Sequence, residues 1–165
     1  MWRLSSRATP KRQARIAGLS DQIGRELATK TILFHHAVAI RLDLNATDLK
    51  CLDLLRHTQM PLTAGNLAEL TGLTGGAITG VADRLEAAGF VERVRDPADR
   101  RRWELHPKAQ RQTEIAALFT PLAQAMTELS AGYNDDQLDL ITDFLTKVSK
   151  IMDDQTSRLR EGPKD

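Results

Sequence analysis

Two short amphipathic segments joined by a tight turn constrain the fold of this chain more than any other feature. They lie in the stretch TAGNLAELTGLTGGAITGVADRLEAAG, residues 63–89. Thr63 and Thr74 can each cap a helix with apolar residues at helical spacing, and Gly89 suits the end of the second helix. The pattern predicts a helix-turn-helix, a motif whose second helix can enter the major groove of DNA.

A basic hairpin is expected directly after this motif. Residues 90–95 and 102–106 read as two strands, the second with Trp103 and Leu105 on one face, and DPAD at 96–99 has the composition of a turn. Its cations are Arg93, Arg95, Arg100, Arg101 and Arg102. Arginines on a narrow projection suit the neutralisation of phosphates and entry into a narrow minor groove. An ordinary surface hairpin is the alternative, but its position favours nucleic-acid binding.

Long helical patterns flank this middle third. We expect helices over about 20–42, from Pro107 to Gly132, and over about 134–159. Parts of the first are apolar nearly all round, which predicts burial on more than one side, as in a dimer. The expected fold is mainly α with a small β-hairpin wing, a winged helix-turn-helix plus a helical dimerisation lobe from both termini.

The expected organisation has three parts. A flexible basic N-terminal arm covers residues 1–18, and a helical dimerisation lobe covers 19–45 and 107–160. The DNA-binding lobe covers 46–106.

Composition narrows the cellular setting and the chemistry. The net charge is only +1, and the single cysteine, Cys51, fits a reducing compartment. The absence of an apolar run of about 20 residues predicts no membrane contact, so we expect a cytoplasmic protein. The sequence contains no G-x-S-x-G, P-loop or H-E-x-x-H motif, which predicts that it is not an enzyme and needs no cofactor.

Two further features favour structural roles. Cys51 lies in an apolar stripe, which indicates a packed thiol more than a redox sensor. His35 and His36 are adjacent on a helix and point about 100° apart, so ordinary polar contacts are favoured over a metal site.

The order of these elements resembles the MarR (multiple-antibiotic-resistance regulator) family of bacterial winged-helix transcription factors, over about Leu19 to Leu159. The resemblance is carried by LAELTGLTGGAITGVADRLEAAGFVER and by Asp99-Arg100-Arg101, which matches the D-x-R signature of the family's wing. It implies a homodimer that binds double-stranded DNA at a pseudo-palindromic operator. It also implies repression that a small-molecule ligand relieves.

The resemblance also assigns roles to residues. It implies that Arg101 enters a minor groove and that Asp99 orients it, while Thr79 is a plausible base reader. Arg84 could instead contact the DNA backbone, or pair with Asp83 or Glu86. The expected DNA-binding residues are Thr63, Thr74, Gly75, Gly76, Thr79, Arg84, Arg95, Asp99, Arg100 and Arg101. The expected ligand pocket comprises Phe34, His35, Val38, Met60 and Phe119.

The helix expected after Thr74 begins with GGAITG and is poor in cations. This composition keeps a second function open, a winged-helix module that binds another protein without specific DNA binding. The glycines themselves have two interpretations, close approach to DNA or packing between helices.

Overall fold

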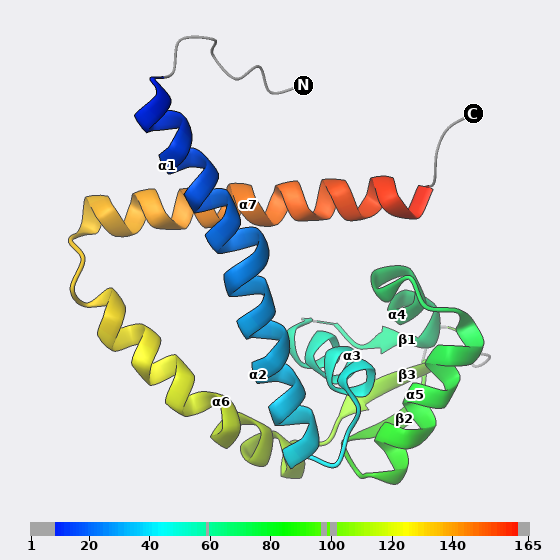
Figure 1. Ribbon diagram of the computed structural model, residues 1–165. Helices are drawn as coiled ribbons and strands as arrows, with labels where there is room; N and C mark the ends of the chain where they lie inside the picture. The colour runs from blue at the N-terminus through cyan, green and yellow to red at the C-terminus, as the bar shows by residue number, and fades with distance from the viewer. Residues whose placement is uncertain (1–8, 59, 97–98, 100–101, 162–165) are drawn as a thin grey trace. The chain divides into compact units, whose positions relative to one another are not determined.

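The computed structural model describes residues 9–58, 60–96, 99 and 102–161. Helices dominate, and the strands form one antiparallel sheet, so the expected fold class is confirmed (Figure 1). The chain divides into two compact units between Asp53 and Leu54. The lobe boundaries expected from the sequence stay a prediction.

The first unit begins with a helix that starts earlier than the sequence pattern indicates. Helix α1 spans Pro10–Asp21, continues as the π-helical segment η1 (Gln22–Leu27), and is followed by α2 (Ala28–Arg41). The Thr9 hydroxyl accepts a hydrogen bond from the Arg12 amide at 3.3 Å, and Pro10 follows this cap.

The predicted helix start at Ser20 is therefore wrong, and the predicted flexible arm is helical from Pro10 onward. Arginine, lysine, glutamine and alanine are good helix formers even without apolar periodicity. The remainder of that arm, residues 1–8, lies outside the described residues.

Helix α3 (Ala46–His57) crosses the division between the units. The Asn45 side chain accepts from the Asp48 amide at 2.8 Å and so caps this helix. Cys51 is fully buried on this helix, which agrees with the expected packed thiol.

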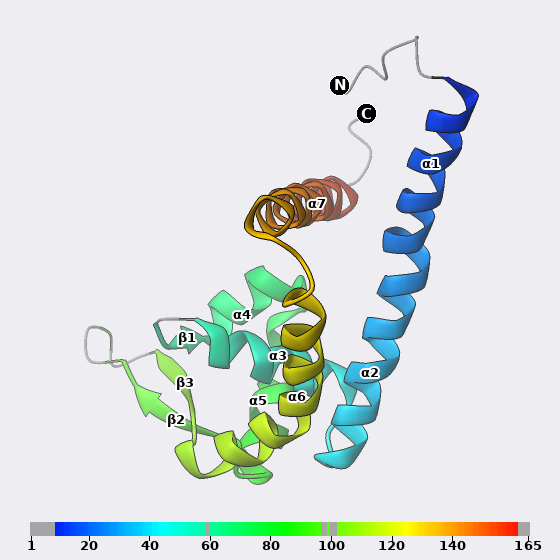
Figure 2. The same ribbon diagram turned by 90° about the vertical axis from the view of Figure 1, so that its left-hand side faces the viewer.

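The second unit contains the expected helix-turn-helix. Helix α4 (Ala64–Thr71) and helix α5 (Gly75–Ala87) are joined through Gly72, whose φ of 74° is left-handed. Strands β1 (Leu62–Thr63), β2 (Val91–Arg95) and β3 (Trp103–Pro107) form an antiparallel sheet in the order β1-β3-β2. Figure 2 shows β2 and β3 side by side as the hairpin that we call the wing.

Strand β1 was not predicted, because two residues carry no alternation. Its register places Leu62 opposite Leu105, which anchors the sheet to the start of α4. The side chains buried in this unit are Leu55, Leu67, Ile78, Val81, Ala82, Leu85, Phe90, Val91, Leu105 and Ile115.

Two long helices complete this unit. Helix α6 spans Ala109–Ser130 and α7 spans Asp135–Glu161. The prediction that α6 starts at Pro107 is wrong, since Pro107 ends β3 opposite Val91. The next amide, that of Lys108, donates to the Phe90 carbonyl at 2.9 Å and extends the pairing instead.

Within the described ranges, no helix has both the length and the apolar character needed to cross a membrane.

Candidate nucleic-acid interface

The N-terminus of α5 is exposed and capped. Thr74 has an extended backbone, and its hydroxyl accepts from the Ala77 amide at 3.3 Å. Thr74, Gly75 and Gly76 are all exposed. A helix start presents unpaired N–H groups and the positive end of the helix dipole, both of which attract phosphate. The cap predicted from the sequence is confirmed.

The glycines at this start do not pack closely against any other described part of the chain. A Cβ built at Gly75 or Gly76 meets no atom of the described residues within 4 Å. Farther along α5, a Cβ at Gly80 would approach the Arg84 guanidinium at 3.3 Å. Helix-to-helix packing therefore does not explain Gly75 and Gly76, and they leave the backbone accessible from outside.

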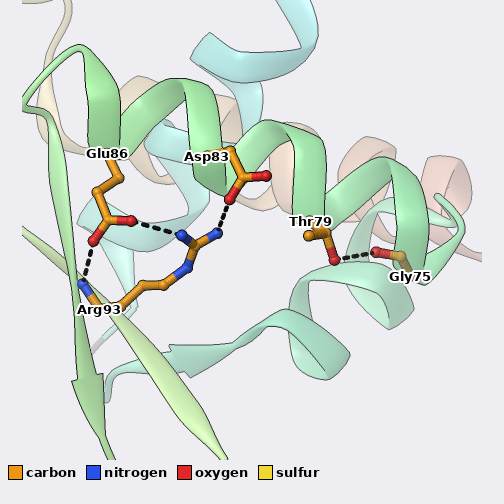
Figure 3. Close-up of polar contacts among 5 residues, drawn as sticks. All are labelled: Gly75, Thr79, Asp83, Glu86 and Arg93. Carbon is orange, nitrogen blue, oxygen red and sulfur yellow. Dashed lines mark hydrogen bonds and ion pairs between the residues drawn. The ribbon is translucent and has the colours of Figure 1, made fainter.

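Thr79 lies one turn into α5 and is exposed. Its hydroxyl donates to the Gly75 carbonyl at 3.0 Å (Figure 3). With its proton used inside the helix, Thr79 presents an acceptor oxygen and a methyl group to solvent. Threonine contacts bases through either group, including the thymine methyl. Arg84 is also exposed on this helix.

Helix α4, which precedes the turn, is held at both of its ends. At the start of α4, Thr63 and Asn66 form a reciprocal capping box, with the Asn66 amide 3.2 Å from the Thr63 hydroxyl. At the end of α4, Arg160 donates to the carbonyls of Glu69 and Leu70 at 3.4 and 3.3 Å. The sequence predicted Thr63 as the cap, but neither the reciprocal contact from Asn66 nor the contact from Arg160, which joins distant segments.

The wing is closed by hydrogen bonds around its turn. The Asp96 amide donates to the Arg102 carbonyl at 3.1 Å, and the Arg102 amide donates to the Asp99 carbonyl at 2.9 Å. The Asp99 carboxylate lies 3.4 Å from the Arg102 guanidinium. Arg100 and Arg101 lie outside the described residues, so the expected pairing of Asp99 with Arg101 stays a prediction.

The stem of the wing carries an arginine stacked on an aromatic ring. The Arg95 guanidinium lies 4.7 Å from the centre of the Trp103 ring. Leu105 is buried, as its place in the strand suggests, but 45% of Trp103 is exposed. The stack leaves Arg95 on the outside of the wing.

Arg93 joins β2 to α5. Its two terminal nitrogens lie 2.5 Å from the Asp83 carboxylate and 2.6 Å from the Glu86 carboxylate (Figure 3). The hydrogen bond to Asp83 is the main reason why the pKa of Arg93 lies above its ordinary value, although partial burial opposes this. From the sequence, Arg84 was one candidate partner of Asp83 or Glu86. The spacing of the two acids places them on one face of the helix, but this spacing does not identify which cation binds them.

An open hollow lies between α5 and the sheet. Its volume is about 400 Å³, and its lining combines apolar side chains with the Asp83–Arg93 pair. The lining residues are Ala64, Thr79, Ala82, Asp83, Arg93, Trp103 and Leu105. None of the ligand-pocket residues predicted from the sequence is among them.

Those predicted pocket residues are divided between the two units. In the first, Phe34 and His35 meet edge to face at 5.8 Å, and Val38 is buried. In the second, Met60 is 74% exposed and Phe119 is half-buried. The predicted pocket stays a prediction.

The His35 ring nitrogen Nδ1 lies 2.8 Å from the Thr31 carbonyl, an ordinary polar contact of the kind expected. Across the part of the chain that the structure describes, no group of three or more His, Cys, Asp or Glu residues could hold a metal ion.

Comparisons with known sequences point to one family. The model of the MarR family matches residues 44–103. The HTH-type transcriptional regulator YcgE of Bacillus subtilis (strain 168) is 42% identical over 140 residues, which are 85% of this chain and 90% of that relative. A second regulator of that type from the same strain, YsmB, is 26% identical over 91 residues, or 55% of this chain and 62% of that relative.

Solved structures show the same fold. The transcriptional regulator Tm0710 from Thermotoga maritima has a TM-score of 0.58 at 22% identity, with 84% of this chain and 96% of that chain covered. A MarR family protein from Bacillus stearothermophilus has a TM-score of 0.67 at 19% identity, with 88% and 99% covered. At these identities the similarity concerns the fold alone.

Proposed function

This chain belongs to the MarR family of transcriptional regulators, and from that premise we propose that it binds specific sequences of double-stranded DNA as a homodimeric repressor. The regulators of this family are not enzymes. We further propose that a small-molecule ligand releases the repressor from its operator and that the protein acts in the cytoplasm.

The observation that carries the proposal is the exposed start of α5 next to the wing. Thr74 caps that start, and Gly75 and Gly76 leave its backbone open to an approaching phosphate or base edge. Arg95 lies on the outside of the adjacent strand. With α5 in the major groove and the wing arginines at the adjacent phosphates of the DNA backbone, the two elements would contact one continuous stretch of duplex.

Binding to DNA is tested through its salt dependence. Duplexes enriched from a random pool by the wild-type protein supply an operator, and an unrelated duplex of equal length supplies the reference. Binding constants at several salt concentrations then give the slope of log K against log salt. We expect Arg101→Ala, at the D-x-R position of the wing, to weaken binding to both duplexes. We expect it to lower the slope by about 1 per subunit.

A matched control is Arg158→Ala, which removes the same charge from an exposed position of α7. It should leave the slope and the affinity close to those of the wild type. An Arg101 variant that behaves like this control would contradict the assignment of the wing.

The uncharged first turn of α5 favours one alternative, a winged-helix module that docks on another protein. That alternative predicts no salt-sensitive retardation of any enriched duplex. A gel-shift series across salt concentrations therefore distinguishes the two functions.

Exposed apolar side chains on the terminal helices support the homodimer. Helix α7 exposes Leu140, Ile141, Phe144, Leu145, Ile151 and Met152, and α6 exposes Leu122, Met126 and Leu129. On α6 the spacing of four and three residues places all three on one face. Apolar surface of this extent is characteristic of an interface, and the family resemblance makes a second copy of this chain its occupant.

Light scattering tests the dimer. We expect the wild type to have the mass of two 18.3 kDa chains. Leu145→Glu should shift it toward one chain, because a charge would be buried in an apolar interface. Thr146→Glu introduces the same charge on the polar side of α7 and should remain dimeric. A wild type that stays monomeric at every concentration would contradict the dimer.

The effector is tested by the same operator assay. Small molecules that lower operator affinity would support release by a ligand, and substitutions at Phe34 and Phe119 would examine the pocket expected from the sequence. A ligand whose effect is unchanged by both substitutions would contradict that pocket.

A further inference from the structure

Both the side chain and the backbone amide of Arg93, a residue of β2, bind carboxylates of α5. Its guanidinium contacts the carboxylates of Asp83 and Glu86, and its backbone amide donates to the second Glu86 oxygen at 3.3 Å. One glutamate thus holds both the main chain and the side chain of the same strand residue (Figure 3). Hydrogen bonds between charged partners are the stronger kind, and a bond to the main chain also fixes the strand itself.

Because Arg93 lies in the middle of β2, its contacts with α5 influence the position of the rest of the wing. Arg93 pairs with Leu105, and Arg95 follows two residues nearer the turn. A strand rises about 3.3 Å per residue, so a small rotation at Arg93 is carried outward to Arg95 and the turn. Because α5 and the wing must contact one duplex together, their relative position determines which sequences fit.

The charges explain why Arg93 itself is a poor candidate for a phosphate contact. Two carboxylates already surround the guanidinium, and only 27% of its side chain is exposed. A phosphate would have to displace Asp83 or Glu86, and it would then leave that carboxylate unpaired next to the DNA backbone. Unpaired acids beside phosphates repel them.

We propose that Arg93 is a positioning residue for DNA binding, which holds the wing against α5 through Asp83 and Glu86 without contacting DNA. This inference rests on the proposed function. It removes Arg93 from the wing cations that the sequence suggested as phosphate contacts, and it gives Asp83 and Glu86, two acidic residues of α5, a role in DNA binding.

The first test compares Arg93→Gln with the wild type on the enriched operator and on the unrelated duplex. We expect the ratio of the two affinities to fall about tenfold, within the range for residues that share one ion-pair network. The salt slope should stay at the wild-type value, because no phosphate contact is lost. Arg93→Lys can keep one of the two carboxylate contacts and should recover part of the ratio.

The second test replaces the two acids, and it separates their general electrostatic effect on DNA binding from their effect on the operator ratio. Asp83→Asn and Glu86→Gln each remove a negative charge and should therefore tighten binding to the unrelated duplex. Because each also removes one ion pair of Arg93, they should lower the operator ratio. Asp83 is 60% exposed, so Asp83→Asn should fold even if Arg93→Gln does not.

A coupling measurement completes the design. In the Asp83→Asn/Glu86→Gln background, a further Arg93→Gln change should alter the operator ratio less than twofold, because the two ion pairs of Arg93 are already absent. A full tenfold effect in that background would overturn the inference.

The remaining outcomes separate this inference from the proposed function. If the wild type binds its operator and Arg93→Gln keeps the wild-type ratio, the inference alone is overturned. The same follows if Arg93→Gln lowers the slope by about 1, as a lost phosphate contact would. A wild type that binds no duplex in a salt-dependent way would overturn both.

Discussion

Replacing Gly72 with alanine tests the turn of the helix-turn-helix. Gly72 caps α4 with a φ of 74°, and the added Cβ would lie 3.0 Å from Nε of Arg160. Gly89 is a matched control, since its φ is 75° and a Cβ there meets no described atom within 4 Å. The two substitutions share the backbone cost and differ in the steric contact.

The backbone cost comes from the left-handed conformation. An L-residue pays roughly 1–2 kcal/mol there, and the lower entropy of the unfolded alanine chain offsets part of this. We therefore expect Gly89→Ala to lower the free energy of unfolding by about 1 kcal/mol.

At Gly72 the Arg160 guanidinium must also move away. Its hydrogen bonds to Glu69 and Leu70 are long and exposed, at 3.4 and 3.3 Å. Together they should add only about 0.5–1 kcal/mol to the cost, because solvent replaces them readily. The expected total for Gly72→Ala is thus about 1.5–2 kcal/mol.

Urea unfolding at one fixed protein concentration measures these differences, since the stability of a dimer depends on concentration. The free energy of unfolding must fall with urea concentration at the wild-type slope in every variant, so that a shift of the unfolding midpoint reports a change in stability. In an Arg160→Ala background, Gly72→Ala should cost no more than Gly89→Ala. Equal costs for the two glycine variants in the wild type would refute the contact of Arg160 with this turn. A neutral Gly89→Ala would refute the backbone argument.

Two further predictions concern α5. Thr74→Ala removes the cap and should lower the free energy of unfolding by about 1 kcal/mol in the same urea assay. Thr74→Ser keeps the acceptor oxygen and should lose much less, so equal losses would contradict the cap. Leu85→Ala truncates a fully buried side chain and should lower the free energy of unfolding by about 2–5 kcal/mol. Leu70→Ala, at a half-exposed position of α4, should lower it by less than about 1 kcal/mol. Similar losses for the two leucine variants would contradict the burial of Leu85.

Local signals predicted much of the helix-turn-helix. Thr63 and Thr74 were predicted as caps because a cap satisfies amides two or three residues away, and those residues follow directly in the sequence. Gly89 ends its helix for an equally local reason, its left-handed backbone. The early start of α1 also has a local signal, the cap Thr9 followed by Pro10, but the prediction missed it because apolar periodicity is lacking there.

Contacts between distant segments could not be predicted in this way. The sequence placed Asp83 and Glu86 on one face of a helix and Arg93 on a strand, yet several arginines could have paired with those acids. Only the packing of β2 against α5 brings Arg93 within 2.5–2.6 Å of both. Strand β1 likewise exists because β3 pairs with it, since two residues carry no pattern of their own.

The sequence by itself therefore determined the helix-turn-helix with its caps at Thr63 and Thr74, the wing hairpin and the family, because each depends on neighbouring residues or on a short motif. The tertiary structure alone decided the partners of Arg93 and the ring on which Arg95 stacks. It assigned Arg93 to two acids of α5 and left Arg95 stacked on Trp103 at the surface. The physical reason is that an ion pair depends on distance in space, and the fold sets that distance.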